Sequence, residues 1–178
     1  TMKITKVTED AVATLLDDLL KRSPNNYTGY ADKVQAIIDD VRERGDEALF
    51  EMTKRFDGAE LNADNIRVTQ AEIDEAYTLV DASLIEVIRK AMTNIRVYHE
   101  KQRQYGWFDT TPDGTILGQK VTPLQSTGVY VPGGKAAYPS SVLMNVIPAK
   151  VAGVEKIVMV TPPGKDGKVN PGTLVAAN

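Results

Sequence analysis

The sequence contains no cysteine and a single histidine, His99, among its 178 residues. Without thiols, this chain forms no disulfide, no thiolate nucleophile and no zinc site with sulfur ligands. A catalytic zinc site commonly uses three protein ligands, mostly nitrogen, so one histidine does not supply a histidine-rich metal site. We therefore expect the chain either to use carboxylates, hydroxyls, amides and backbone groups for its chemistry, or to be part of something larger.

Long apolar runs and a strong charge imbalance are also missing. No stretch of about 18 apolar residues exists, and residues 1–4 lack the apolar core of a secretory signal. The net charge is −3, from 21 basic and 24 acidic residues, which indicates no nucleic-acid-binding surface. We expect a cytoplasmic globular protein of one ordinary or two small domains, with neither a nucleic acid nor a membrane as partner.

Apolar residues at helical spacing predict a mostly helical first half. Thr8 is a plausible N-cap for a helix that ends near Ser23, and Gly45 stops a second helix. A third helix opens at Asp46 and is closed by Asp57-Gly58. The apolar stripe of the second helix is Val34, Ile37, Ile38 and Val41, and the predicted inward residues of the third are Leu49, Phe50, Met52 and Phe56.

A short strand is predicted at Ile66–Val68, directly before Thr69 and Glu72, which match a helix capping box. A long helix is then predicted over about residues 83–105. Its apolar stripe is Leu84, Ile85, Ile88, Met92, Ile95 and Tyr98.

Sheet-forming residues dominate after Gly106. Strands are predicted over 107–111 and 115–124, joined by a turn at Pro112-Asp113-Gly114. Further on, the sequence predicts a strand–helix–strand unit. It consists of a strand, a glycine loop at 132–134, a helix from Pro139 to about Ala152 and an apolar strand.

The near-continuous apolar run 156–160 is typical of a parallel strand covered on both faces. Asn170 opens a last helix that has barely two turns when the chain stops at Asn178. A two-stranded parallel sheet leaves most of its apolar surface exposed. We therefore expect a chain that is cut within an α/β repeat.

The glycine loop lies where α/β domains commonly bind ligands. It is not a dinucleotide-binding G-x-G-x-x-G motif, because Gly128 and Gly133 are too far apart. It also differs from a phosphate-binding loop, because its spacing is one residue too long and Ala136 replaces the Ser or Thr. The loop is either a ligand-binding turn or a tight turn that only reverses the chain.

Tyr130 is the residue that we single out, because it ends a predicted buried strand at the mouth of this loop. Its ring and hydroxyl could stack on or hydrogen-bond a flat ligand, although an ordinary half-buried tyrosine is the alternative. Ser140 and Ser141 lie where helix N–H groups favour an anion, or they only cap the helix. His99 is interpreted as a packing or surface residue.

The acidic residues of the first half are interpreted as solvated helix faces; they are Asp39, Asp40, Glu43, Asp46 and Glu47. Taken alone, the residues of this chain predict a ligand-binding half-site and no catalytic centre.

Several segments resemble histidinol dehydrogenase. The most specific is Tyr130-Val-Pro-Gly-Gly, followed by Tyr138-Pro-Ser-Ser-Val-Leu-Met-Asn, Pro148-Ala-Lys-Val-Ala-Gly-Val and Val160-Thr-Pro-Pro. Upstream, Arg44-Gly-Asp-Glu-Ala-Leu, Phe56-Asp57 and Asn94-Ile-Arg-Val-Tyr-His-Glu-Lys-Gln102 agree with the same family. The resemblance covers essentially the whole chain.

This resemblance implies a homodimeric enzyme that uses zinc and NAD to oxidise L-histidinol to L-histidine through an aldehyde, in histidine biosynthesis. It implies a pair of incomplete Rossmann-like, aldehyde-dehydrogenase-like domains, and it assigns Tyr130 to NAD binding. It assigns no zinc ligand, catalytic residue or substrate-binding residue to this chain. Family members are more than twice as long, so those residues are expected beyond Asn178.

We therefore predict an α/β fold with an N-terminal helical arm and helical layer, followed by the start of an incomplete Rossmann-like domain. The predicted domains are residues 1–24 (the arm), 25–125 (mostly helical, with a β-hairpin near 107–124) and 126–178. We expect the N-terminal portion of a histidinol dehydrogenase, inactive and zinc-free by itself. A stand-alone ligand-binding or interaction module and a relative acting on another amino alcohol remain alternatives.

Overall fold

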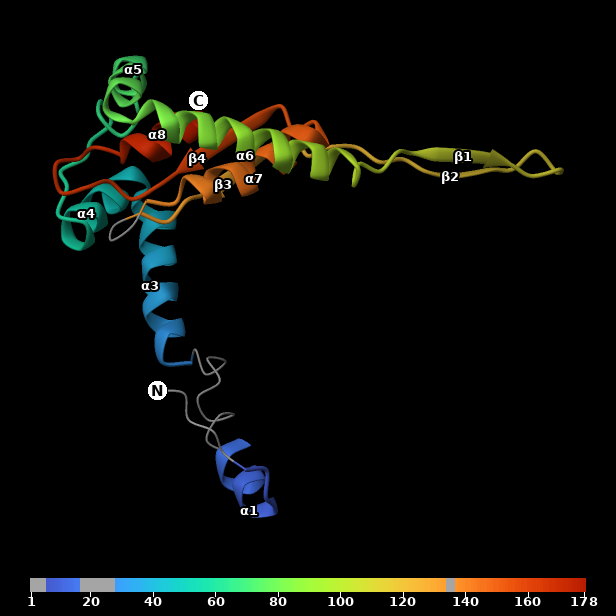
Figure 1. Cartoon of the computed structure of the whole chain (residues 1–178), viewed down its shortest axis with the longest axis horizontal. Helices are drawn as coiled ribbons and strands as arrows, with labels where there is room; N and C mark the ends of the chain where they lie inside the picture. Colours follow the sequence, from blue (N-terminus) through green and yellow to red (C-terminus); the bar gives the residue numbers. More distant parts are fainter. Residues whose placement is uncertain (1–5, 17–27, 134–136) are drawn as a thin grey trace. The chain divides into compact units, whose positions relative to one another are not determined.

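The computed structural model describes residues 6–16, 28–133 and 137–178, and the chain divides into two units, residues 1–49 and 50–178. In its described residues the first unit contains a short α-helix, a π-helical turn and a long helix (Figure 1). A further helix begins in this unit and ends in the second. In chain order these elements are α1 (Glu9–Ala11), η1 (Val12–Leu16), α3 (Thr28–Arg44) and α4 (Asp46–Phe56).

A side-chain cap and two glycines set the ends of these helices, as predicted. The Ala11 N–H donates to the Thr8 hydroxyl oxygen at 3.1 Å and thereby caps α1. Gly45 at φ +60° ends α3, and Gly58 at φ +74° follows α4. Glycine adopts this left-handed conformation at little steric cost. The predicted end of the first helix near Ser23 lies outside the described residues.

The predicted inward face of α4 is wrong in part. Leu49 and Phe56 are 40% and 62% exposed, whereas Ala48 and Thr53 are buried. The Arg55 guanidinium lies over the ring of Phe56, 5.3 Å from its centroid, and such a cation–π contact is favourable at an exposed position. Small residues rather than the largest apolar ones occupy the buried positions of this helix, so hydrophobicity alone assigned its face incorrectly.

The described part of the second unit contains an antiparallel and a parallel two-stranded sheet, with α7 between the two parallel strands in sequence (Figure 1). The predicted hairpin and the predicted strand–helix–strand unit are both confirmed, but the second hairpin strand ends at Gln119 and not at the predicted residue 124. The fold is mixed α/β and mostly helical. Its elements are α5 (Gln70–Leu79), α6 (Ala82–Glu100), β1 (Trp107–Thr110), β2 (Ile116–Gln119), β3 (Ser126–Tyr130), α7 (Pro139–Ala152), β4 (Lys156–Val160) and α8 (Pro171–Ala177).

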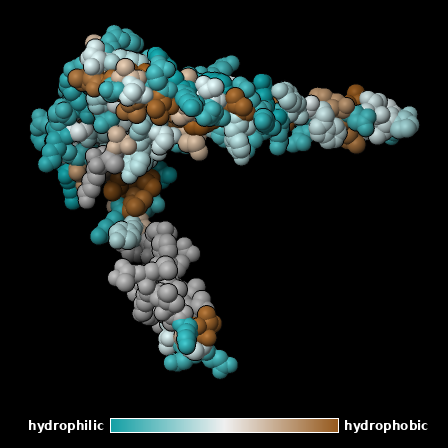
Figure 2. Space-filling model, viewed as in Figure 1, coloured by the Kyte–Doolittle hydropathy of each residue, from teal (hydrophilic) through white to brown (hydrophobic). Residues whose placement is uncertain are grey.

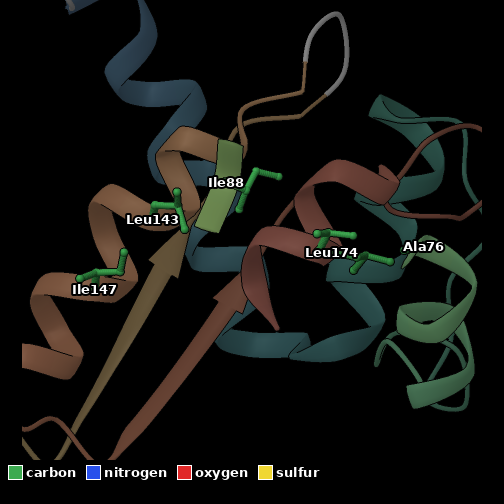
Figure 3. Close-up of a cluster of buried hydrophobic side chains, with 6 residues drawn as sticks. Ala76, Ile88, Leu143, Ile147 and Leu174 are labelled. Atoms are coloured by element: carbon green, nitrogen blue, oxygen red, sulfur yellow. The ribbon is translucent and has the colours of Figure 1, made fainter. Parts of the chain in front are cut away.

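Helix α7 packs on two sides and forms the centre of the second unit. One buried cluster joins it to α5, α6 and α8 (Figure 3), and a second cluster joins it to β3. Full burial of one valine, leucine or isoleucine side chain contributes about 1.5–3 kcal/mol to the stability of the folded state. The first cluster consists of Ala76, Ile88, Leu143, Ile147, Leu174 and Val175. The second consists of Val129, Val131 and Val142.

The short strand predicted at residues 66–68 is wrong, because Asn62 organises a turn there. The side-chain oxygen of Asn62 accepts from the N–H groups of Asp64 and Asn65, at 2.8 and 3.1 Å. Its backbone carbonyl accepts from the Ile66 N–H at 3.0 Å. Asparagine offers the backbone these local partners in competition with a strand ladder.

The long helix α6 starts earlier and ends earlier than predicted. Asp81 is its N-cap and accepts from the Ser83 N–H at 2.7 Å. The hydrogen bonds from the Ser83 hydroxyl and N–H hold the pKa of Asp81 below its usual value. Within the predicted stripe Ile88 is buried, but Tyr98 is 62% exposed. Neither α6 nor any other helix in the described residues is long and apolar enough to cross a membrane.

Strand β4 is not covered on both faces, contrary to the prediction. Val158 and Val160 are 48% and 57% exposed, whereas Ile157 and Met159 pack against the cluster between β3 and α7. Successive side chains of a strand point to opposite faces. Only one face of β4 therefore lies against α7 in the part of the chain that the structure describes.

The predicted capping box at the start of α5 is confirmed. The Thr69 N–H donates to a Glu72 carboxylate oxygen at 2.7 Å, and the Glu72 N–H donates to the Thr69 hydroxyl at 3.3 Å. The backbone hydrogen bond from Thr69 is the main reason why the pKa of Glu72 lies below its usual value.

Replacing Glu72 by glutamine is expected to lower the free energy of unfolding near neutral pH but not in acid. A carboxylate whose pKa is lowered by folding stabilises the folded state above its unfolded pKa, about 4.3, and loses that effect as the pH falls through its folded pKa. Urea denaturation of the wild type and Glu72→Gln at pH values from neutral to about 3 measures this. Glu155→Gln, in an exposed loop, is the control; a difference for Glu72→Gln that is constant with pH would contradict the assignment.

Candidate functional site

The carboxyl ends of β3 and β4 lie side by side, and they form the candidate site. Tyr130 pairs with Val160 at the end of the parallel ladder. The N–H of the next residue, Val131, donates to the Val160 carbonyl at 2.9 Å. Because Val129 and Val131 point into the core, Tyr130 points to the other face, where it is 63% exposed. Tyr130 is thus more exposed than the half-buried strand tyrosine considered as the alternative.

Gly133, in the loop after β3, lies close to Thr161 and Pro162, which follow β4. A Cβ added at Gly133 would lie 3.0 Å from the Pro162 carbonyl oxygen, 3.3 Å from the Pro162 ring and 3.4 Å from the Thr161 hydroxyl. Backbone and proline ring atoms cannot turn away as a flexible side chain can. Glycine is therefore required here for close approach, and the contact fixes the two strand-end loops against each other.

The helix after the loop begins without a side-chain cap. Tyr138 is the N-cap of α7 but accepts no hydrogen bond with its side chain, and Pro139 occupies the first helical position. Ser140 is exposed in the first turn, and the Ser141 carbonyl accepts from the Asn145 amide at 2.7 Å. Uncapped N–H groups at a helix start favour an anion, so this end of α7 is chemically suited to a phosphate or carboxylate group.

His99 belongs to a different region, at the end of α6. Its Nδ1 lies 2.7 Å from Oε1 of Gln102, and its ring meets the Tyr98 ring edge-on with centroids 5.2 Å apart. It lines a cavity of about 370 Å³ whose walls include Pro148 and Val151, at the opposite end of α7 from the glycine loop. The predicted packing or surface role of His99 agrees with these contacts.

Two acidic residues of the first unit, Asp39 and Asp40, form ion pairs and hydrogen bonds on the surface of α3. The Arg44 guanidinium donates to both carboxylate oxygens of Asp40, at 2.6 and 2.8 Å, and this hydrogen bonding lowers the pKa of Asp40. Asp39 accepts from Gln35 at 2.8 Å and pairs with Arg42 at 3.4 Å. Among residues 6–16, 28–133 and 137–178, no group of three acidic or histidine side chains gathers that could hold a metal ion.

Two long-range contacts of the second unit were missed by sequence reasoning. Lys168 pairs with Glu75 at 3.2 Å, and the Asn178 amide donates to the Tyr77 hydroxyl at 3.3 Å. The partners are 93 and 101 residues apart. No local pattern in a single sequence identifies such partners, and the same is true of the contact between Gly133 and Pro162.

Comparisons with known proteins agree on one family. The family model of histidinol dehydrogenase matches residues 20–178 of this chain. The chain is 60% identical over 159 residues to the histidinol dehydrogenase of Bacillus subtilis (strain 168), and 54% identical over 161 residues to that of Heliobacterium mobile. This chain belongs to the histidinol dehydrogenase family.

A solved structure supports the same assignment. The crystal structure of histidinol dehydrogenase from Elizabethkingia anophelis matches 84% of this chain with a TM-score of 0.78 and 37% sequence identity. The two sequence relatives match 89% and 90% of this chain. The chain spans 37% and 38% of the lengths of those relatives and 34% of the solved histidinol dehydrogenase chain.

Gly133→Ala is expected to destabilise this chain by about 1–3 kcal/mol, because an added methyl group would overpack against Pro162. Gly128→Ala is the matched control in the preceding strand, since nothing lies within 4 Å of a Cβ added there. The control is expected to be neutral or slightly stabilising. Urea denaturation of the wild type and both variants tests this, and equal stability of the two variants would show that the close approach is unimportant.

Proposed function

We propose that this chain is the N-terminal portion of a histidinol dehydrogenase, the zinc- and NAD-dependent oxidoreductase that converts L-histidinol to L-histidine in histidine biosynthesis. The observation that carries the proposal is the family match over residues 20–178, with 60% identity to the Bacillus subtilis relative. Because the chain spans about 37% of that relative, the activity is proposed for the longer protein. By itself the chain is expected to be inactive.

Tyr130 is proposed as an NAD contact. It lies at the carboxyl end of a parallel strand, the position at which α/β sheets bind cofactors, and its ring is 63% exposed. When bound, NAD supplies the acceptor for the hydride that leaves the alcohol and then the aldehyde. Tyr130 would orient the cofactor by stacking or hydrogen bonding, held in place by the bond between the Val131 N–H and the Val160 carbonyl.

The described residues do not fit a zinc site. They provide no cluster of three side chains that could hold the ion, and the sequence has one histidine and no cysteine. Proton removal from the alcohol also needs a base within hydrogen-bond reach, and His99 makes its contacts with Tyr98 and Gln102 instead. We therefore assign no catalytic or zinc-binding residue to this chain.

The finer organisation also forms part of the proposal. We propose residues 1–24 as an arm, 25–125 as the first part of one domain and 126–178 as the first half of an incomplete Rossmann-like domain. The parallel pair of β3 and β4 with α7 supports the last of these. A homodimer working in the cytoplasm completes the proposal.

A chimera tests the proposed function. The 178-residue chain, joined to the remaining part of the Bacillus subtilis relative, is expected to reduce NAD in the presence of L-histidinol, measured as NADH formation. The chain alone is expected to show no turnover and no stoichiometric zinc by elemental analysis. A folded chimera that oxidises only another amino alcohol, or a chain that is active or zinc-loaded by itself, would overturn the proposal.

Tyr130→Ala in that chimera is expected to raise KM for NAD about three- to tenfold, with a smaller change in KM for L-histidinol, because one aromatic contact contributes on the order of 1 kcal/mol. Tyr130→Phe separates stacking, which it keeps, from hydrogen bonding. Tyr98→Ala is the control, since Tyr98 is 62% exposed but lies on α6. An unchanged KM for NAD in Tyr130→Ala would remove Tyr130 from the cofactor site.

A further inference from the structure

The cavity beside His99 lies apart from the strand ends and has walls of mixed chemistry. Its volume is about 370 Å³, and small-molecule sites begin at roughly 300 Å³. Three segments form it: the end of α6 with the chain that follows, residues 121–123 after β2, and the end of α7. Figure 2 shows hydrophobic and hydrophilic residues side by side where α6 leads into the hairpin. The cavity therefore suits a ligand that has both an apolar and a polar part.

Part of the wall is apolar and is supported by the core. Pro148 and Val151 come from the last turns of α7, and Val121 and Pro123 come from the segment after β2. Val151 also packs against the buried cluster that joins α7 to α5, α6 and α8. The side chains of proline and valine have no hydrogen-bonding group. This wall favours a hydrocarbon body, aromatic or aliphatic.

The polar part of the wall offers mainly hydrogen-bond donors. The Arg103 guanidinium lies over the Tyr105 ring, 5.4 Å from its centroid. Arg103 forms no ion pair with any residue that the structure describes. A guanidinium presents a planar fork of N–H donors that matches a carboxylate. The Gln102 amide and the Thr122 hydroxyl can donate as well.

Charge around the cavity favours an anionic ligand. Residues 99–106, 120–123 and 148–152 contain one acidic residue, Glu100, which does not line the cavity. Basic residues of the same segments are exposed, so their positive potential extends to the mouth of the cavity and attracts an anion. These basic residues are Lys101, Arg103, Lys120 and Lys150.

The walls are held in place by backbone contacts. A Cβ added at Gly106 would lie 2.8 Å from the Gln119 carbonyl oxygen, so the chain after α6 lies directly against the end of β2. Gly153 ends α7 at φ +90°, and a Cβ added there would lie 3.6 Å from the Pro123 ring. A cavity whose walls are already in place loses less conformational entropy when a ligand binds.

We propose that this cavity binds a small carboxylate with an apolar body. The Arg103 guanidinium holds the carboxylate, and the body lies against Pro123, Pro148 and Val151. Since Pro148 and Val151 lie at the carboxyl end of α7, this site is separate from Tyr130 and the glycine loop, which precede the helix. The proposal stands independently of the proposed dehydrogenase activity.

His99 provides a direct measurement, because it lines the cavity and is the single histidine of the chain. Its ring C–H signals in the NMR spectrum of the 178-residue chain are expected to shift saturably with phenylacetate. A dissociation constant on the order of 1 mM is expected for a ligand of about ten non-hydrogen atoms. Phenylacetamide, which lacks the charge, and acetate, which lacks the ring, are each expected to bind about tenfold more weakly.

A matched pair of variants tests the assignment of Arg103. Arg103→Gln is expected to raise the dissociation constant of phenylacetate about three- to tenfold, because a charge-assisted hydrogen bond is lost. Lys90→Gln removes the same charge from an exposed position of α6 that does not line the cavity, and is expected to change the constant less than about twofold. The His99 signals without ligand show whether each variant keeps the fold. Absence of a saturable shift, equal binding of phenylacetamide, or equal effects of the two variants would each overturn the proposal.

The chimera tests whether the cavity is open in the longer protein. Para-fluorophenylacetate, followed by fluorine NMR, is expected to bind the chimera, and Arg103→Gln is expected to weaken this binding as in the 178-residue chain. Binding to the chain but not to the chimera would overturn the proposal, because the rest of the protein would then fill the cavity. Absence of binding in a chimera that oxidises L-histidinol would refute this site and leave the proposed function intact.

Discussion

The second unit depends on one constraint, which is that α7 must be apolar on two sides at once. Val142 packs on the β3 side, whereas the next residue, Leu143, packs among α5, α6 and α8. An α-helix that is buried on one side shows a single apolar stripe. Among the described residues α7 supplies buried side chains to both clusters, and Ala176 of α8 also packs against both, so the position of the strand ends follows mainly from the packing of α7.

That packing determines where the candidate site lies. With Val129 and Val131 held against α7, the alternation of the strand sends Tyr130 to the opposite face. The close approach of Gly133 to Pro162 then fixes the loops beyond the two strands against each other. The described residues thus place an exposed aromatic ring near the contact between Gly133 and Pro162, and the helix that follows begins without a side-chain cap.

The features that sequence reasoning predicted well are those set by a few neighbouring residues. Thr69 and Glu72 define a helix start, Asp113 and Gly114 define a hairpin turn, and Asn170 caps the last helix through bonds to Gly172 and Thr173. The errors arose where a competing contact decides the outcome. Asn62 organises a turn that includes Ile66, and small residues take the buried positions of α4.

The candidate site was predictable in part for the same reason. Neighbouring residues predicted the end of the strand and the glycine loop, and Tyr130 lies between these two features. The contact between Gly133 and Pro162 joins segments about thirty residues apart, and the pairing of Glu75 with Lys168 joins residues 93 apart. Contacts of this kind depend on how elements pack, which hydrophobic periodicity and turn residues do not encode.

The double-sided packing of α7 limits how its length can vary among related chains. One inserted or deleted residue rotates everything beyond it by about 100°, which would turn Ile147 away from its cluster while Val142 and Leu143 stayed in place. Natural length variation should therefore avoid the span from Pro139 to Ala152 and collect in the surface turn at residues 111–115, where an extra residue displaces no buried side chain.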